Sequence, residues 1–303
     1  MIRPPRLHPG DAIRVVAPSG PVPAEEFERG AAVLASRYDL RIDPTALQRR
    51  QGYLAGPDEL RLAELVDAFR DRATRAVIMA RGGYGLLRIL TGLPLDLVQG
   101  CAKPVVAFSD GTALLARLAC AGVVGIHGPV VTQLGRLAVE DQQGLFDALE
   151  DPHGRPLLRD LELVRPGRAE GRLLGGNLEV FSRLLGTPLA PDVTGAVLFF
   201  EEVGERPYRV DRLFTHLELA GIFERAAAVI VGDLVACEEP PTSKVASPTA
   251  SQVVRERLSR LKIPAVVGAA IGHGPRNRAL PYGARVDLDA EAGTLTALEG
   301  AVS

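Results

Sequence analysis

A serine stands where an apolar strand pattern changes into a helix pattern. The run Val105 to Phe108 leads into Ser109, and apolar residues with helical spacing follow. Such an elbow lifts a hydroxyl above the carboxyl end of a sheet, where N–H groups of the helix amino terminus can meet a developing oxyanion. Ser109 is therefore a candidate nucleophile. A helix cap suits the same position, and the pattern leaves both roles open.

A nucleophilic serine needs a base, and His273 is the best placed of the five histidines. It follows an expected buried strand, Ala265 to Ile271, and a glycine on each side lets the backbone turn tightly. His127 has similar neighbours, Gly125-Ile-His-Gly-Pro129, but it lies in the same half of the chain as the serine. We interpret His127 as an alternative base or as a hydrogen-bonded packing residue.

The base in turn needs a carboxylate to orient it. Glu201 and Glu202 end the most apolar strand pattern of the chain, Ala196 to Phe200. Strand ends of this kind line crevices in open α/β sheets, and we favour Glu201 as the orienting acid. Glu202 and Glu205 are equally consistent with surface charges that pair with nearby arginines.

The segment Arg81-Gly-Gly-Tyr-Gly85 joins an expected strand to a helix. Its backbone N–H groups could bind an anion or the oxyanion of a tetrahedral intermediate, although the glycines could also merely form a tight turn. It is not a dinucleotide fingerprint, because Arg88 stands where the third glycine of Gly-x-Gly-x-x-Gly would be.

Alternating strands and helices must position these residues. Strands are expected at Ala12 to Ala17, Leu40 to Ile42, Ala76 to Met79 and Val105 to Phe108, and helices at Ala24 to Ser36, Leu60 to Arg70 and Gly85 to Leu90. This rhythm predicts βαβ units and a mostly parallel, Rossmann-like sheet. We expect residues 1–150 to form this domain.

The alternation weakens near Asp151, and a polar stretch with breakers continues to Gly171, where we place a linker. A second, mixed α/β domain is expected over residues 171–303. Its elements are a turn at Gly175 and Gly176, a helix at Leu178 to Leu185, strands at Ala196 to Phe200, Ala226 to Val231 and Ala265 to Ile271, a helix at Asp211 to Leu219, and a hairpin of Ala284 to Leu288 with Thr294 to Leu298. Glu238 to Ser251 is expected to be a surface loop.

Composition excludes several classes of function. Lys and Arg number 35 against 37 Asp and Glu, so no overall field draws the chain to nucleic acid. No segment offers about 18 uninterrupted apolar residues, and the amino terminus has no apolar signal region, so neither membrane spanning nor export is expected. The three separated cysteines, Cys101, Cys120 and Cys237, indicate reduced thiols in a cytoplasmic protein rather than disulfides or a metal site.

Seven segments in this order resemble the LD-carboxypeptidase family of serine peptidases, which also includes the microcin-immunity peptidases. They are Gly10 to Gly20, Arg81 to Gly85, Phe108 to Thr112, His127 to Pro129, Gly175 to Leu178, Glu201 to Arg212 and Gly272 to Pro275. The resemblance implies that Ser109 is the nucleophile, that His273 is the base and that Glu201 orients it. It also implies an oxyanion hole made by the backbone N–H groups of Asp110 and Gly83. Glu202 departs from the family, whose members often have aspartate there.

The resemblance further implies hydrolysis of the bond before a terminal D-alanine in murein tetrapeptide, without metal or cofactor. Arg81, Arg212 and Arg276 are candidate partners for the terminal carboxylate. We expect a small peptide substrate and a homodimer. Alternatives are a microcin-type peptidase acting on aminoacyl or peptidyl nucleotides, an α/β-hydrolase esterase, and a non-catalytic peptide-binding module.

Overall fold

The first half of the chain alternates strands with helices. The computed structural model describes residues 1–240, 242 and 247–303. The strands of the first half are β1 (Ala12–Val16), β2 (Asp39–Arg41), β3 (Ala76–Met79), β4 (Val105–Ala107) and β5 (Gly125–His127). Its helices are α1 (Ala24–Ala35), α2 (Pro44–Gln48), α3 (Asp58–Arg70), α4 (Leu86–Ile89), α5 (Leu95–Gly100), α6 (Thr112–Cys120), α7 (Val131–Leu134) and α8 (Val139–Glu150), with short 3₁₀ turns η1 (Leu90–Gly92) and η2 (Ser109–Gly111).

The second half supplies the remaining elements. Its strands are β6 (Pro156–Leu158), β7 (Glu162–Arg165), β8 (Arg168–Asn177), β9 (Val197–Val203), β10 (Ala228–Val235), β11 (Ala265–Val267), β12 (Leu280–Tyr282), β13 (Arg285–Asp289) and β14 (Thr294–Ala297). Its helices are α9 (Leu178–Leu184), α10 (Pro207–Leu219), α11 (Ile222–Arg225) and α12 (Ala250–Ser259).

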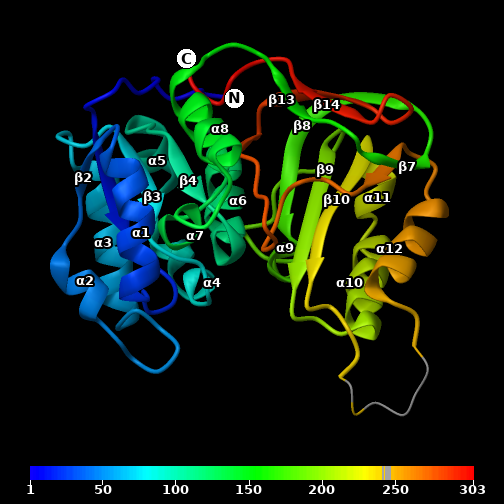
Figure 1. Ribbon diagram of the computed structural model, residues 1–303, viewed down its shortest axis with the longest axis horizontal. Helices are drawn as coiled ribbons and strands as arrows, with labels where there is room; N and C mark the ends of the chain where they lie inside the picture. The colour runs from blue at the N-terminus through cyan, green and yellow to red at the C-terminus, as the bar shows by residue number, and fades with distance from the viewer. Residues whose placement is uncertain (241, 243–246) are drawn as a thin grey trace.

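Two sheets organise these elements (Figure 1). The first has the order β12-β5-β4-β3-β1-β2, and β1 to β5 pair in parallel throughout. The second has the order β6-β14-β13-β8-β9-β10-β11-β7, in which β8 to β11 are parallel and the outer strands are antiparallel. The predicted fold class, a Rossmann-like parallel domain followed by a mixed α/β domain, is confirmed.

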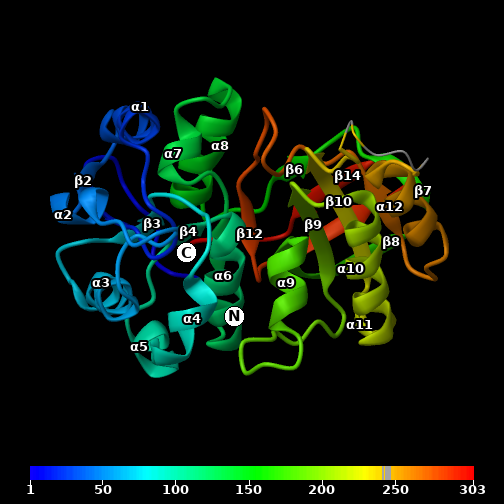
Figure 2. The ribbon, with the colours of Figure 1, turned by 90° about the horizontal axis from the view of Figure 1, so that it is seen from below.

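Helices cover the first sheet on both faces. Figure 2 shows α1, α7 and α8 on one side of it and α3, α4 and α5 on the other. Strands buried on both faces read as continuous apolar runs, which is why β3 and β4 consist of buried Ala, Val, Ile and Met. Helix α6 lies between the two sheets and contacts both β8 and α9. The residue that precedes this helix region, Ser109, therefore faces the boundary between the sheets.

The expected linker contains ordered strands. Between Asp151 and Gly171 the chain forms β6, β7 and the start of β8, all in the second sheet. This stretch is polar because β7 lies at the sheet edge and because the first residues of β8 are half-buried or exposed. Gly175 and Gly176, expected as a turn, instead lie within β8, just before its last residue, Asn177. The separation into domains at residues 1–150 and 171–303 as independent folding units stays a prediction.

The chain crosses between the sheets near its carboxyl end. β11 belongs to the second sheet, whereas the next strand, β12, pairs antiparallel with β5 in the first. Part of the expected surface loop, residues 241 and 243–246, lies outside the described residues, and α12 begins at Ala250 through a capping box between Thr249 and Gln252. The terminal hairpin of β13 and β14 forms as predicted, with Gly293 in its turn at φ +63°.

Close helix packing fixes α7, which borders the region in front of Ser109. A Cβ on Gly30 of α1 would lie 1.7 Å from the carbonyl oxygen of Val131 in α7. On the α7 side, a Cβ on Gly135 would lie 2.7 Å from the carbonyl carbon of Arg29. Glycine is therefore required at both positions because the two backbones touch.

We expect Gly30→Ala to destabilise the protein by about 1–3 kcal/mol, because the added methyl must push α1 away from α7. Gly144 is the matched control, since it also lies within a helix but a Cβ there would meet nothing closer than 3.8 Å. Gly144→Ala should stabilise the protein by about 0.5–1 kcal/mol through helix propensity alone. Urea unfolding measures both, and equal effects of the two substitutions would contradict this account of the packing.

Candidate active site

Ser109 occupies a strained elbow at the end of β4. Its φ is +62°, in the left-handed region that residues other than glycine rarely adopt. The chain passes from β4 through Phe108 into η2 and then into α6, so the helix amino terminus directly follows the serine. Strain at a residue that carries a reactive group is typical of functional sites. Ser109 does not cap the following helix, because η2 begins at the serine itself and the N-cap residue of α6 is Gly111.

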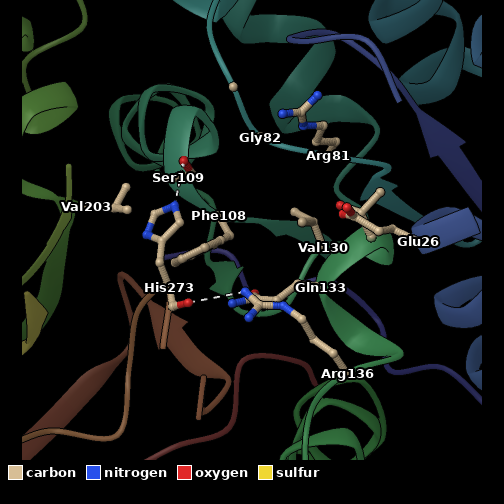
Figure 3. Close-up of a pocket in the computed structure, with 12 residues that line it drawn as sticks. Glu26, Arg81, Gly82, Phe108, Ser109, Val130, Gln133, Arg136, Val203 and His273 are labelled. Atoms are coloured by element: carbon tan, nitrogen blue, oxygen red, sulfur yellow. Dashed lines mark hydrogen bonds between the residues drawn. The ribbon is translucent and has the colours of Figure 1, made fainter. Parts of the chain in front are cut away.

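The side chains of Ser109, His273 and Glu201 form a continuous hydrogen-bonded line. His273 Nε2 lies 3.2 Å from Ser109 Oγ, and His273 Nδ1 lies 2.7 Å from Glu201 Oε2. Figure 3 shows the imidazole pointing at the serine. The structure thus brings together the three residues that the sequence singled out from segments far apart in the chain.

The two neighbouring glutamates have different surroundings at the end of β9. Glu201 is fully buried and contacts His273, whereas Glu202 turns to the other side and accepts hydrogen bonds from backbone N–H groups of Glu179 and Val203 and from the Asn177 amide. Burial raises the pKa of Glu202 to about 7, although these donors favour its charged form. The Asn177 amide donates to both carboxylates, at 3.3 Å to Glu201 and at 3.1 Å to Glu202, but only Glu201 meets the histidine.

A carboxylate that sequence reasoning missed, Asp233, holds the histidine turn from the side of β10. Its Oδ2 accepts a hydrogen bond of 3.1 Å from the N–H of Gly274, and its own N–H donates to the carbonyl of Ile271. A Cβ on Gly272 would lie 2.8 Å from Asp233 Cβ, which explains the glycines that flank His273. A register shift between Val231 and Leu234 directs Asp233 toward this turn. No local sequence pattern marks such a shift.

His127 is a core residue. Its ring lies between Phe108, at a centroid distance of 5.3 Å, and Phe199, at 4.7 Å, and it is completely buried. Burial, followed by the charge of His273, lowers the pKa of His127 to about 3. Within the described part of the chain neither ring nitrogen has a hydrogen-bond partner. The packing interpretation holds for His127, but without the hydrogen bond that we expected.

The glycine turn after β3 touches the serine. A Cβ on Gly82 would lie 2.8 Å from Ser109 Cβ, and Gly83 adopts φ +110° beside Gly20. The residue after the serine, Asp110, has a buried side chain that accepts hydrogen bonds from Ser19 Oγ at 2.7 Å and from the backbone N–H of Leu86 at 2.9 Å. This carboxylate ties the serine elbow to the loops around it.

A pocket of about 320 Å³ opens in front of Ser109 and His273. Its other lining residues are Glu26, Arg81, Gly82, Gly83, Phe108, Val130, Thr132, Gln133, Arg136 and Val203. Figure 3 shows Glu26, Arg81 and Arg136 around its mouth. Arg81 donates to the carbonyl of Pro21 at 2.6 Å, and Arg136 donates to the carbonyl of His273 at 3.2 Å. Arg136 was not predicted, and no motif surrounds it.

Two predicted cations lie away from this pocket. The guanidinium of Arg212 packs over the ring of Tyr208, 5.3 Å from its centroid, in a separate depression between α9 and α10. Arg276 pairs with the buried Asp141 at 2.7 Å. Sequence proximity to the expected glutamate and histidine suggested both, but the turn after His273 and the helical phase of α10 direct them elsewhere.

Metal and membrane sites have no counterpart in the part of the chain that the structure describes. No group of three or more His, Cys, Asp or Glu side chains there is arranged to hold a metal ion. No described helix combines the length and apolar character needed to cross a bilayer. Cys101, Cys120 and Cys237 are all free thiols.

Comparison with known proteins identifies the two halves of the chain. A family model for the LD-carboxypeptidase N-terminal domain matches residues 13–128, and one for the LD-carboxypeptidase C-terminal domain matches residues 170–288. The murein tetrapeptide carboxypeptidase of Pseudomonas aeruginosa is 33% identical over 80% of this chain and 81% of its own length.

Solved structures agree with these matches. The muramoyltetrapeptide carboxypeptidase of Oxalobacter formigenes has a TM-score of 0.81 at 29% identity and covers 95% of this chain and 98% of its own. A structure of the microcin C7 self-immunity protein MccF with glutamyl sulfamoyl guanosine has a TM-score of 0.88 at 22% identity over both full chains, which shows a shared fold. The sequence of MccF from Escherichia coli is 23% identical over 92% of this chain and 91% of its own. Both family models match in chain order, and the sequence of the murein tetrapeptide carboxypeptidase is similar to this one over most of its length. The chain therefore belongs to the LD-carboxypeptidase family of peptidases.

Proposed function

We propose that this peptidase is a serine carboxypeptidase that hydrolyses the bond before the terminal D-alanine of murein tetrapeptide. The observation that carries the proposal is the line from Ser109 Oγ through the imidazole of His273 to the buried carboxylate of Glu201. In an activated nucleophile, a hydroxyl lies within hydrogen-bond reach of a base, and a third group orients that base. Ser109, His273 and Glu201 have this arrangement. Its position at the floor of an open pocket gives a peptide access to it.

In the acylation step, Ser109 Oγ attacks the carbonyl carbon of the scissile amide while His273 Nε2 takes the hydroxyl proton. The carboxylate of Glu201, which meets Nδ1, holds the ring orientation and stabilises the imidazolium that forms. His273 then gives the proton to the leaving amine nitrogen, the C–N bond breaks, and D-alanine departs. The acyl group remains on Ser109 as an ester.

In the deacylation step, water attacks the ester carbonyl with His273 again acting as base, and the proton returns to Ser109 Oγ. In both steps the oxyanion receives hydrogen bonds from the backbone N–H groups of Asp110 and Gly83. Two observations support this placement. Asp110 lies in the 3₁₀ turn η2, which begins at the serine, and Gly82, the residue before Gly83, packs directly on the serine side chain.

Removal of a terminal residue requires recognition of its free carboxylate. Arg81 and Arg136 are guanidinium groups on the lining of the pocket, and either could pair with a carboxylate in bidentate fashion. We propose that they supply the positive charge that makes the enzyme an exopeptidase. Arg212 and Arg276 have no part in this proposal, because they lie outside the pocket.

Murein peptide fits the site better than a peptidyl nucleotide. Recognition of a nucleobase generally uses an aromatic stacking platform, and this chain has no tryptophan. Among the pocket-lining residues in the described part of the chain, Phe108 is the sole Phe, Tyr or Trp, and its ring packs against His273 at a centroid distance of 4.5 Å. The relatives named for murein tetrapeptide support the same choice.

We also propose that the enzyme works in the cytoplasm on recycled murein fragments, which agrees with its three free thiols. A homodimer stays a prediction.

Replacement of the three aligned residues should abolish turnover without unfolding the protein. Ser109→Ala and His273→Ala should each lower kcat by at least about 10³-fold, since members of such a unit act together. Glu201→Gln should also be severe, because the amide cannot stabilise an imidazolium. Release of D-alanine from tetrapeptide measures these losses.

Glu202→Gln is the matched control for the acid, since it removes the adjacent carboxylate that does not touch His273. We expect a much smaller loss of kcat than for Glu201→Gln. A larger loss at Glu202 would show that the other carboxylate orients the base.

The raised pKa of Glu202 predicts a pH dependence of stability. Its pKa is about 7 in the folded protein against 4.5 as a free group, so the folded state binds this proton more tightly. The resulting stabilisation is complete below about pH 4.5 and is lost as the pH rises through about 7. Between pH 5 and pH 8 the melting temperature of the wild type should therefore fall more than that of Glu202→Gln. Parallel curves for the two proteins would refute this assignment.

The substrate is tested by competition between two compounds. We expect purified protein to release D-alanine from disaccharide-free murein tetrapeptide with a higher kcat/KM than it releases nucleotide from a peptidyl-nucleotide analogue. The Ser109→Ala protein controls for contaminating activity with both compounds. Preferential cleavage of the nucleotide compound would assign the microcin-type function while leaving the catalytic residues as they are.

A further inference from the structure

The turn that carries His273 belongs to neither sheet. It lies between β11 of the second sheet and β12 of the first, and residues 268–279 form no regular helix or strand. Backbone hydrogen bonds to β10 tether Ala269 and Ile271, the residues that lead into the turn. At residues 272–274 side chains hold the backbone instead, and the distance from His273 to Ser109 depends on them.

Two buried amide side chains hold it on the side of the first sheet. Gln133 Nε2 donates to the carbonyl oxygen of Gly272 at 2.9 Å, and Gln133 Oε1 accepts from Asn277 Nδ2 at 2.7 Å. Asn277 Oδ1 in turn accepts from the N–H of Gly272 at 3.2 Å. The three bonds form a closed ring that satisfies both backbone groups of Gly272, the residue directly before the histidine.

Both amides are almost inaccessible to solvent. Gln133 is 4% exposed and Asn277 is 0% exposed. A buried amide group without a partner costs about 1–3 kcal/mol, so the ring strongly favours one arrangement of the turn. Polar networks that are fully satisfied in this way rigidify the segment they hold.

The ring connects the histidine to the unit that carries the serine. Gln133 lies in α7, and the preceding residue, Thr132, donates its N–H to the carbonyl of Ala80 at the end of β3. β3 pairs directly with β4, which leads into Ser109. A short path of hydrogen bonds thus runs from the serine strand to the residue before His273.

We propose that Gln133 and Asn277 are positioning residues, which act through His273 by fixing the height and direction of its imidazole over Ser109. Neither needs to touch the reacting atoms for this role. The inference rests on the proposed function of His273 as the base. It explains why a glutamine and an asparagine, rather than apolar side chains, occupy buried positions beside the pocket.

Gln133→Met tests the proposal, because methionine keeps the length of the side chain and removes both hydrogen bonds to the turn. The readout is the rate at which a fluorophosphonate probe modifies Ser109, which needs the serine–histidine pair but not the natural substrate. We expect this rate and the kcat for tetrapeptide to fall about 10- to 100-fold, with KM changed little. Circular dichroism establishes that the variant is folded.

Gln142→Met is the matched control. The Gln142 amide donates to the carbonyls of Leu134 and Leu137, so this variant also loses two side-chain hydrogen bonds in the same domain, but none to the histidine turn. It should lose stability and keep the wild-type labelling rate. An equal loss of labelling in Gln142→Met would show that both glutamines act only through general stability.

A second comparison uses the His273→Ala background. If Gln133 acts through the histidine, Gln133→Met should lower the residual labelling rate of His273→Ala no further. An additional loss, or an unchanged rate in Gln133→Met alone, would overturn the proposal.

If Gln133→Met fails to fold, Gln133→Glu takes its place, because the acid keeps the acceptor for Asn277. Relative to the wild type at the same pH, its labelling should recover as the pH falls and the protonated carboxyl donates to Gly272, and a rate equal to that of the wild type at every pH would overturn the proposal.

If wild-type protein is labelled at Ser109 but cleaves no tetrapeptide, the murein function fails while the positioning role is still tested by the labelling rates. The two proposals can therefore fail separately.

Discussion

The hydrogen-bonded line from Ser109 through His273 to Glu201 joins two sheets, and the 3.2 Å distance from His273 to Ser109 sets the requirements for the structure around it. The serine is carried by the parallel sheet of the first half, whereas Glu201 ends a strand of the second. No single element could place both. The histidine lies on the chain segment that passes from one sheet to the other, so its position depends on contacts with each. Asp233 holds the turn from the second sheet, and Gln133 holds it from the first.

This arrangement brings together groups that each lower the stability of the folded protein. A serine at positive φ stores strain of about 1–3 kcal/mol, which only a rigid surrounding can maintain. Buried carboxylates are unfavourable unless they are hydrogen-bonded. Those near the site have such partners: His273 and Asn177 for Glu201, Asn177 and two backbone N–H groups for Glu202, and Ser19 with Leu86 for Asp110. Glycines permit the close approach that these contacts need. The family relationship then gives a chemical reason for maintaining such a site.

Much of the fold could be predicted from local patterns, whereas the contacts that tune the site could not. The alternation of apolar strands and helices correctly placed β1, β3 and α3, because each buries its apolar residues either along one face or, in β3, in a continuous run. The polar stretch after Asp151 was wrongly interpreted as a linker without strands. Edge strands and half-exposed antiparallel strands have few apolar residues, so the sequence pattern did not reveal them. The elbow at Ser109 and the glycines around His273 were visible because they shape the backbone.

The residues that were missed form contacts only in three dimensions. Arg136 lies in front of the serine because α7 packs against α1, and Asp233 reaches its turn through a register shift. Arg212 was predicted to bind substrate because it is near Glu201 in the sequence, but it lies outside the pocket. Proximity along the chain indicates proximity in space only where the intervening element has a known direction.

The central claim is that Ser109 attacks the substrate and carries the acyl group between the two steps. Mass spectrometry after rapid acid quenching of the enzyme with murein tetrapeptide tests it most directly. The account predicts that the peptide containing Ser109 gains the mass of the tetrapeptide minus the mass of D-alanine, and that the adduct disappears as the tripeptide product forms. An adduct on a different residue, or steady release of D-alanine by protein that lacks the Ser109 hydroxyl, would contradict it.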